Sequence, residues 1–194
     1  MRTALIAGLA IVVLGAAGCG SSSSKSSGAP ANPDAPEVSP AGDIPDNQAF
    51  VAYSPPQAGF TVSVPEGWSR STASGVVTFT DKLNTIRLQT AHASAPLTVR
   101  DAKRSVVPKL AKSERGFTLR SISAVTRKAG KAVRIVYLVD AKPNAVTGKA
   151  GQDTVERYVF FHNGEDAIVA LSGPKGADNV DPWRIVSDSV QWAR

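Results

Sequence analysis

The chain has 194 residues, and its 22 lysines and arginines exceed its 16 aspartates and glutamates, which gives a formal net charge of +6. A single cysteine excludes an intramolecular disulfide, and one cysteine with two histidines supplies few of the ligands that a zinc site uses. The same inventory disfavours acid–base catalysis, in which histidine is the commonest participant.

The N-terminus has the layout of a secretory leader. Arg2 precedes an uninterrupted apolar run over residues 4–14, and small residues follow as far as Cys19. That run is shorter than the roughly 20 residues that a transmembrane helix needs, so residues 1–18 are predicted to be a leader. The ending Ala-Ala-Gly-Cys resembles a bacterial lipoprotein signal, in which the cysteine becomes the lipidated first residue of the mature chain. Ala16 stands where that class usually has leucine, and a membrane anchor or a simple cleaved leader is the alternative.

Residues 19–58 are predicted to form a disordered tether that begins at the lipidated Cys19. They contain a serine-rich run and several prolines, and aliphatic side chains are almost absent before Phe50 and Val51. Such a segment buries too little apolar area to offset its conformational entropy. We expect a plain spacer that holds the following domain clear of the membrane.

Residues 59–194 are predicted to form one globular domain, because short β-branched runs alternate there with turn residues. Seven strands of a largely antiparallel sheet are expected, over residues 60–64, 76–80, 85–90, 117–125, 132–139, 155–162 and 167–172. The firmest local prediction is a type I′ hairpin turn at Asn163-Gly164, since both residues tolerate positive φ. Apolar side chains occupy both faces of residues 132–139, which indicates a strand covered on both sides.

The first predicted helix begins after Thr98, which can cap the backbone together with Asp101. Pro108 removes a backbone donor within the same segment, so a kink or an early break before Ser113 is expected.

The second predicted helix uses Asp181 as its cap and Pro182 as its first residue. Its apolar stripe is expected to pack on the sheet and consists of Trp183, Val186 and Val190. Strands followed by a helix, more strands and a second helix indicate an α+β fold.

The segment Phe60-Thr-Val-Ser-Val-Pro-Glu-Gly-Trp68 resembles the opening strand and P-x-G-W turn of the PsbP-like fold. The helix after Thr98, the strand pair around Gly130, the Asn-Gly hairpin and a closing helix ending near Trp192 follow in the order of that family. The tether makes the chain most similar to actinobacterial lipoproteins of the LpqN type. The resemblance covers residues 59–194 and implies an α/β/α sandwich with a binding or accessory role, no catalytic centre and no cofactor.

Few side chains suggest chemistry of their own. His92 and His162 have no orienting partner nearby in sequence, and no spacing of histidine, cysteine or acidic residues is typical of a zinc or calcium site. Trp68, beside the flexible Gly67, is the candidate aromatic binding residue, with core packing as the default alternative.

A basic stretch between Arg100 and Arg134 carries 11 lysines and arginines and two acidic residues. Arg100, Arg104 and Lys112 are its candidate binding residues, and anionic lipids, an acidic wall polymer or an acidic envelope protein are candidate partners. Nucleic acid is disfavoured, because no aromatic side chains interleave these basic residues. The alternative is a solvated surface that keeps the domain soluble.

These features favour a lipoprotein on the extracytoplasmic face of the cell membrane that acts as a non-catalytic binding or accessory module. One alternative is a carrier of an apolar or anionic small molecule, held in a cavity between the sheet and one helix. Another is a hydrolase, for which a nucleophile motif is missing.

Overall fold

The computed structural model describes residues 41–56, 58–143, 148 and 150–193. Cys19, the predicted leader 1–18 and the first part of the predicted tether lie outside these residues, so predictions about them stay predictions. None of the helices in the described ranges is long and apolar enough to cross a bilayer.

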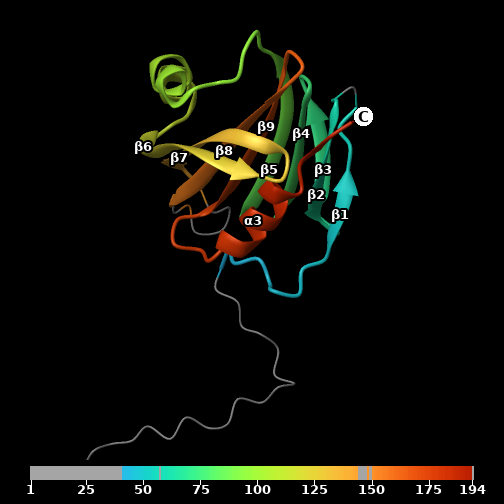
Figure 1. Ribbon diagram of the computed structural model, residues 1–194. Coiled ribbons are helices and arrows are strands. Elements are labelled where there is room, and N and C mark those ends of the chain that lie inside the picture. Colours follow the sequence, from blue (N-terminus) through green and yellow to red (C-terminus); the bar gives the residue numbers. More distant parts are fainter. Residues whose placement is uncertain (1–40, 57, 144–147, 149, 194) are drawn as a thin grey trace, which may run out of the picture. The chain divides into compact units, whose positions relative to one another are not determined.

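The main sheet has seven antiparallel strands in the order β3-β4-β5-β9-β8-β7-β6 (Figure 1). A smaller antiparallel sheet has the order β1-β2-β10. The bounds of the main-sheet strands are β3 Ser69–Ala73, β4 Val76–Asp81, β5 Asn84–His92, β6 Thr118–Arg127, β7 Gly130–Asp140, β8 Gln152–His162 and β9 Glu165–Pro174. The small sheet consists of β1 Phe50–Tyr53, β2 Phe60–Pro65 and β10 Gln191–Trp192.

All seven predicted strands are present, and β8 and β9 are joined at Asn163-Gly164 with positive φ at both residues. The strand expected at residues 60–64 is β2, and it lies in the small sheet instead of the main one. The main sheet is completed by β3, whose five residues are all exposed. An edge strand needs only backbone pairing on one side, so β3 carries no hydrophobic alternation that a sequence could reveal.

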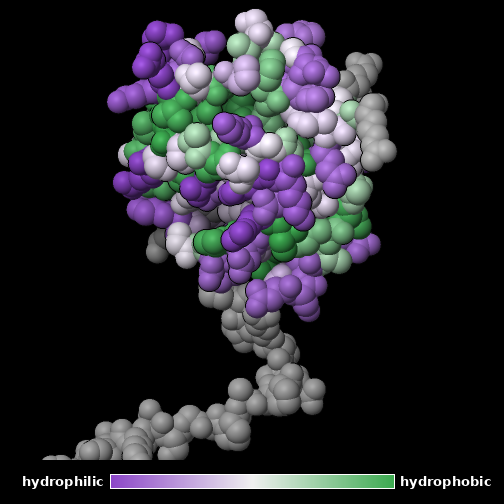
Figure 2. Space-filling model, viewed as in Figure 1, coloured by the Kyte–Doolittle hydropathy of each residue, from purple (hydrophilic) through white to green (hydrophobic). Residues whose placement is uncertain are grey.

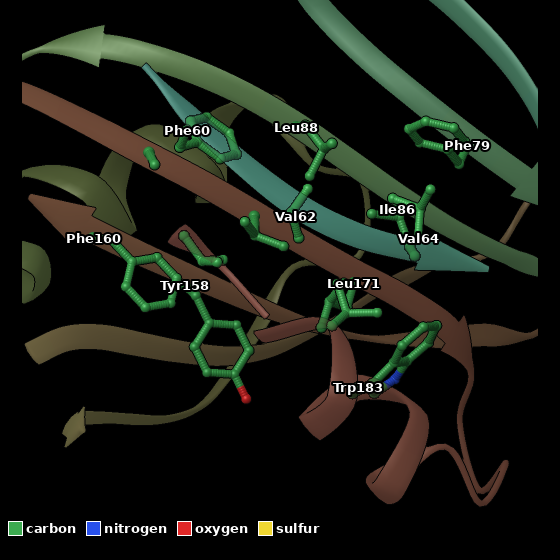
Figure 3. Close-up of a cluster of buried hydrophobic side chains, with 14 of the residues drawn as sticks. Phe60, Val62, Val64, Phe79, Ile86, Leu88, Tyr158, Phe160, Leu171 and Trp183 are labelled. Carbon is green, nitrogen blue, oxygen red and sulfur yellow. The ribbon is translucent and has the colours of Figure 1, made fainter. Parts of the chain in front are cut away.

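Each face of the main sheet has its own hydrophobic core. The first core lies between the sheet, β2 and helix α3 (Val180–Asp188), and Figure 3 shows how their apolar side chains meet, among them Phe60, Val62, Leu88, Leu171 and Trp183. The second core lies under a continuous helical run and contains Ala102, Leu110, Val133, Ile135 and Tyr137. The predicted α+β class with a largely antiparallel sheet is confirmed. The expected sandwich has helices alone in its outer layers, whereas in the structure the layer with α3 also contains the small sheet.

The helical run consists of α1 (Val99–Asp101), the π-helical turn η1 (Ala102–Val106) and α2 (Val107–Ser113). The Thr98 hydroxyl accepts a hydrogen bond from the backbone N–H of Asp101 and donates one to its carboxylate, which confirms the predicted cap. Of the kink or early break expected at Pro108, the break is wrong, because the run continues to Ser113, while η1 interrupts its regular α-helical geometry directly before α2. The wider turn of η1 places Pro108 in the first turn of α2, where a missing N–H costs little.

Helix α3 starts and ends earlier than its sequence predicts. Its N-cap is Asn179, so the prediction of Asp181 as the cap is wrong. It ends at Asp188 instead of near Trp192, because the Ser189 hydroxyl accepts a hydrogen bond from the backbone N–H of Ser63 at 2.7 Å and ties the end of the helix to β2. The predicted stripe of Trp183, Val186 and Val190 is buried.

The predicted boundary between tether and domain at residue 58 is also wrong, because residues 41–56 already belong to the folded part. Ile44 is buried, and its backbone N–H donates a hydrogen bond to Oδ1 of Asn179 at 2.8 Å. Strand β1 pairs along β2. Asn179 lies 135 residues further along the chain, so composition near Ile44 does not reveal this contact.

Candidate functional site

A cavity of about 710 Å³ opens between the end of α2 and the main sheet. The helical run packs against strands β6, β7 and β8, and β4 and β5 contribute no side chain to the second core. Side chains from β4, β5, β7, β8 and β9 therefore line the floor and sides of the cavity, while Leu110, Ser113 and Glu114 close it at the helix.

Two arginines lie in one row across the floor of this cavity. Arg87 on β5 and Arg157 on β8 are both paired with Ala170 on β9, and Thr78 on β4 is paired with Arg87. Residues paired in this way project from the same face of a sheet. Neighbouring strands are about 4.8 Å apart, so the backbones of the two arginines are about 10 Å apart, with only the methyl group of Ala170 between them.

The two guanidinium groups act on each other across this space. Burial lowers the pKa of Arg157; the nearby Tyr137 and Glu114 oppose that shift, whereas the positive charge of Arg87 adds to it. An arginine nevertheless stays protonated in a protein. The Nε–H of Arg157 is buried and has no hydrogen-bond partner, and neither arginine forms an ion pair with any residue that the structure describes.

The rest of the lining is partly apolar and partly polar. Its apolar side chains are Leu110, Val139, Val155 and Ile168, and its polar ones include threonines of β4 and β5. Tyr137 belongs to the lining as well, and burial raises its pKa to about 12, so that its phenol is neutral at physiological pH. The lining therefore suits a ligand with an apolar part and a polar part.

Acidic side chains balance most of the positive charge in the lining. The four basic residues are Lys82, Arg87, Lys142 and Arg157, and the three acidic ones are Glu114, Asp140 and Asp153. Burial raises the pKa of Asp153, although a hydrogen bond with Ser172 opposes the shift. The lining as a whole has a formal charge of one positive unit.

The sequence-predicted binding residues lie outside this cavity. Arg100, Arg104 and Lys112 are exposed on the helical run, and hydrophilic side chains gather at the upper left of Figure 2, where Figure 1 draws that run. Arg104 forms an exposed ion pair with Asp101 at 2.7 Å. Trp68 packs against the edge of the first core.

The two histidines lie together at one end of the main sheet. His92 on β5 and His162 on β8 are both paired with Glu165 on β9, and the ring of His162 stacks on Trp192 with 5.1 Å between centroids. Both histidines are exposed, and the described residues contain no group of three potential ligands that could hold a metal ion.

The predicted basic surface is smaller than the sequence suggests, because two of its arginines form ion pairs within the domain. Arg127 donates hydrogen bonds to the hydroxyls of Ser187 and Tyr158 and pairs with Asp188 at 3.5 Å. Arg134 pairs with Glu156, which also accepts a hydrogen bond from Tyr158.

Proteins of known structure share this architecture. Cyanobacterial PsbP (CyanoP) from Synechocystis sp. PCC 6803 has a TM-score of 0.53 and 17% identity over 81% of this chain and 96% of its own. The Ran-binding protein Mog1p of Saccharomyces cerevisiae has a TM-score of 0.50 and 9% identity over 75% of this chain and 96% of its own. These likenesses confirm the predicted PsbP-like fold.

A third structure, LpqN of Mycobacterium tuberculosis, which is involved in cell envelope biogenesis, has a TM-score of 0.45 and 14% identity over 77% of this chain and 93% of its own. That likeness is too distant to carry an argument. No family model and no curated protein matches the chain.

Proposed function

We propose that the protein is a non-catalytic binding module of the cell envelope, attached to the membrane through a lipid on Cys19, and that it binds a small molecule in the cavity over Arg87 and Arg157. The observation that supports the binding role is the cavity itself. Its 710 Å³ falls within the range of about 300–1,000 Å³ that is usual for small-molecule sites. Its lining combines apolar side chains with polar groups, which is the composition that such sites share.

The same cavity favours the carrier alternative over the hydrolase alternative. Hydrolysis by a side-chain nucleophile requires a base within hydrogen-bonding reach of it. His92 and His162 lie at the far end of β5 and β8 and do not line the cavity. The cavity lining offers binding groups and contains no histidine that could serve as that base.

The binding role is tested by native mass spectrometry of the protein purified gently from its own cells. We expect a fraction of the protein to carry a bound small molecule that is lost on denaturation. A protein that is free of any bound molecule after rapid isolation, and that binds nothing from a total envelope extract, would contradict the role.

The anchor is supported by the sequence of the leader and is tested separately. Cys19→Ser removes the acceptor of the lipid and is expected to release the protein from the membrane fraction, while the matched control Ser22→Ala stays with the membrane. Two acyl chains are needed for stable anchoring, so loss of the acceptor has a large effect. Membrane retention of Cys19→Ser would refute the anchor.

The exposed basic residues Arg100, Arg104 and Lys112 are proposed to attract anionic lipids or acidic polymers of the envelope. Reversing all three to glutamate is expected to weaken binding to anionic vesicles, with a difference that shrinks as salt is added. The control reverses three exposed basic residues outside the stretch, which are Arg70, Lys175 and Arg184. Equal binding by the two triple variants would show that this surface is merely solvated.

A further inference from the structure

We infer that the ligand of the cavity is an amphiphilic organic monoanion, whose carboxylate lies between Arg87 and Arg157 and whose apolar body lies against Leu110, Val139 and Val155. This inference rests on the proposed binding function and assigns the chemical class of the ligand.

The position of the carboxylate follows from the row of paired residues. Arg87 and Arg157 flank Ala170, so the smallest side chain of the row lies between the two arginines. Two positive charges that face each other across a cavity repel, and a bound anion removes that repulsion. A planar guanidinium also offers two parallel N–H donors that match the two oxygens of a carboxylate.

The buried Nε–H of Arg157 also needs a hydrogen-bond acceptor at this place. A buried donor without a partner costs free energy, and the described residues provide none for this atom. A carboxylate over Ala170 would accept from it. Arg87 is the more exposed of the two, and it would close the site from the solvent side.

The single negative charge follows from the balance of the lining. Four basic and three acidic side chains leave one positive unit for the ligand to neutralise. A phosphate monoester carries a charge near −2 at pH 7 and would meet the carboxylates of Glu114 and Asp153. The lining therefore favours a carboxylate over a phosphate.

The apolar body of the ligand is inferred from the volume of the cavity and from the apolar side chains in its lining. A cavity of about 710 Å³ is far larger than a bare carboxylate. Ile168 lies two residues from Ala170 on β9, while Val155 lies two residues from Arg157 on β8, so apolar side chains lie on either side of the arginine row. Leu110 reaches over them from α2.

The inference is tested by calorimetric titration of the full chain carrying Cys19→Ser with four probes: decanoate, decanol, decyl phosphate and acetate. Decanoate is expected to bind, and each of the other three is expected to bind more weakly. Arg157→Met and Arg87→Met should each weaken decanoate binding by about 10- to 100-fold, the range of a charged hydrogen bond. Neither variant should change the affinity for decanol.

The control is Arg120→Met, an exposed arginine outside the lining, which should bind decanoate as the parent does. Arg157→Lys keeps the charge and removes the fork of donors, so intermediate affinity is expected. It also guards against misfolding of the methionine variant, and dispersion of the amide NMR spectrum checks the fold of every variant.

Each unexpected result has a distinct meaning. Equal affinity for decanoate and decanol would overturn the carboxylate, tighter binding of decyl phosphate would overturn the monoanion, and equal binding of acetate would overturn the apolar body. Failure of all four probes, with a bound molecule still present in the native protein, would overturn this inference and leave the proposed function standing. Failure of the probes together with a ligand-free native protein would overturn both.

Discussion

Asn179→Ala is the perturbation that most sharply tests how the chain entering the domain is held in place. Oδ1 of Asn179 accepts a hydrogen bond from the backbone N–H of Ile44 at 2.8 Å. Its Nδ2 donates to the carbonyl of Gly42 at 2.9 Å and to Oδ1 of Asn84 at 3.1 Å. Asn179 and Asn84 are both buried, with 3% of each residue exposed.

The expected loss of stability follows from the groups that the substitution leaves without partners. The carbonyl of Gly42 keeps a hydrogen bond from Asn84, whereas the N–H of Ile44 and Oδ1 of Asn84 lose theirs. Each buried, unsatisfied group costs about 1–3 kcal/mol, so the free energy of unfolding should fall by about 2–6 kcal/mol. Asn179 makes no side-chain hydrogen bond as the cap of α3, so no capping contribution is added.

The assay is urea unfolding followed by tryptophan fluorescence, combined with hydrogen exchange at the amide of Ile44. The matched control is Asn47→Ala, an exposed asparagine, which should change stability by less than about 0.5 kcal/mol. A loss below about 0.5 kcal/mol for Asn179→Ala, together with unchanged exchange at Ile44, would show that Asn179 does not hold residues 42–44 in place.

Three further predictions concern packing, ionisation and the attachment of α3. Gly173→Ala should lower the free energy of unfolding by about 1–3 kcal/mol, because a Cβ there would collide with the buried side-chain amides of Asn84 and Asn179. The control Gly151→Ala has open space around it and should leave stability unchanged in the same unfolding assay. Burial raises the pKa of Tyr137 to about 12, compared with about 10 in the unfolded chain, so the free energy of unfolding should fall as pH rises from about 10 to 12. Tyr137→Phe should flatten that decline in a series of unfolding curves measured at different pH values. An unchanged dependence of stability on pH would contradict the raised pKa. Arg127→Met should lower the melting temperature by the loss of about 1–3 kcal/mol from its bonds to α3, and a melting temperature equal to that of the parent would show that those bonds do not hold the helix.

Local sequence signals predicted the elements whose causes are local. The Asn163-Gly164 turn, the Thr98 cap and the β-branched runs each depend on residues within a few positions of one another, and the structure contains all of them. The PsbP-like order of elements depends on the same signals, which is why the fold could be predicted.

The features that the sequence did not reveal depend on distant partners. Ile44 is ordered by Asn179, and β3 exists because β4 offers it a free edge. Arg127 appears in the sequence as part of a basic stretch, but it faces α3, whose residues come 60 positions later.

The binding cavity was predicted only as a possibility between the sheet and a helix, without its residues. Residues 85–89 alternate between apolar and polar side chains, which signals one uncovered face for β5. That Arg87 faces Arg157 depends on the registers of β5 and β8 with β9, and register is a property of the assembled sheet.

We propose that the cavity beneath α2 binds an anionic ligand between Arg87 and Arg157. A crystal structure of the protein grown with decanoate would show whether the ligand lies there. We expect a carboxylate over Ala170, within hydrogen-bonding distance of Nε of Arg157 and of the guanidinium of Arg87. Decanoate bound at another surface, with the Arg87–Arg157 row unchanged, would contradict it.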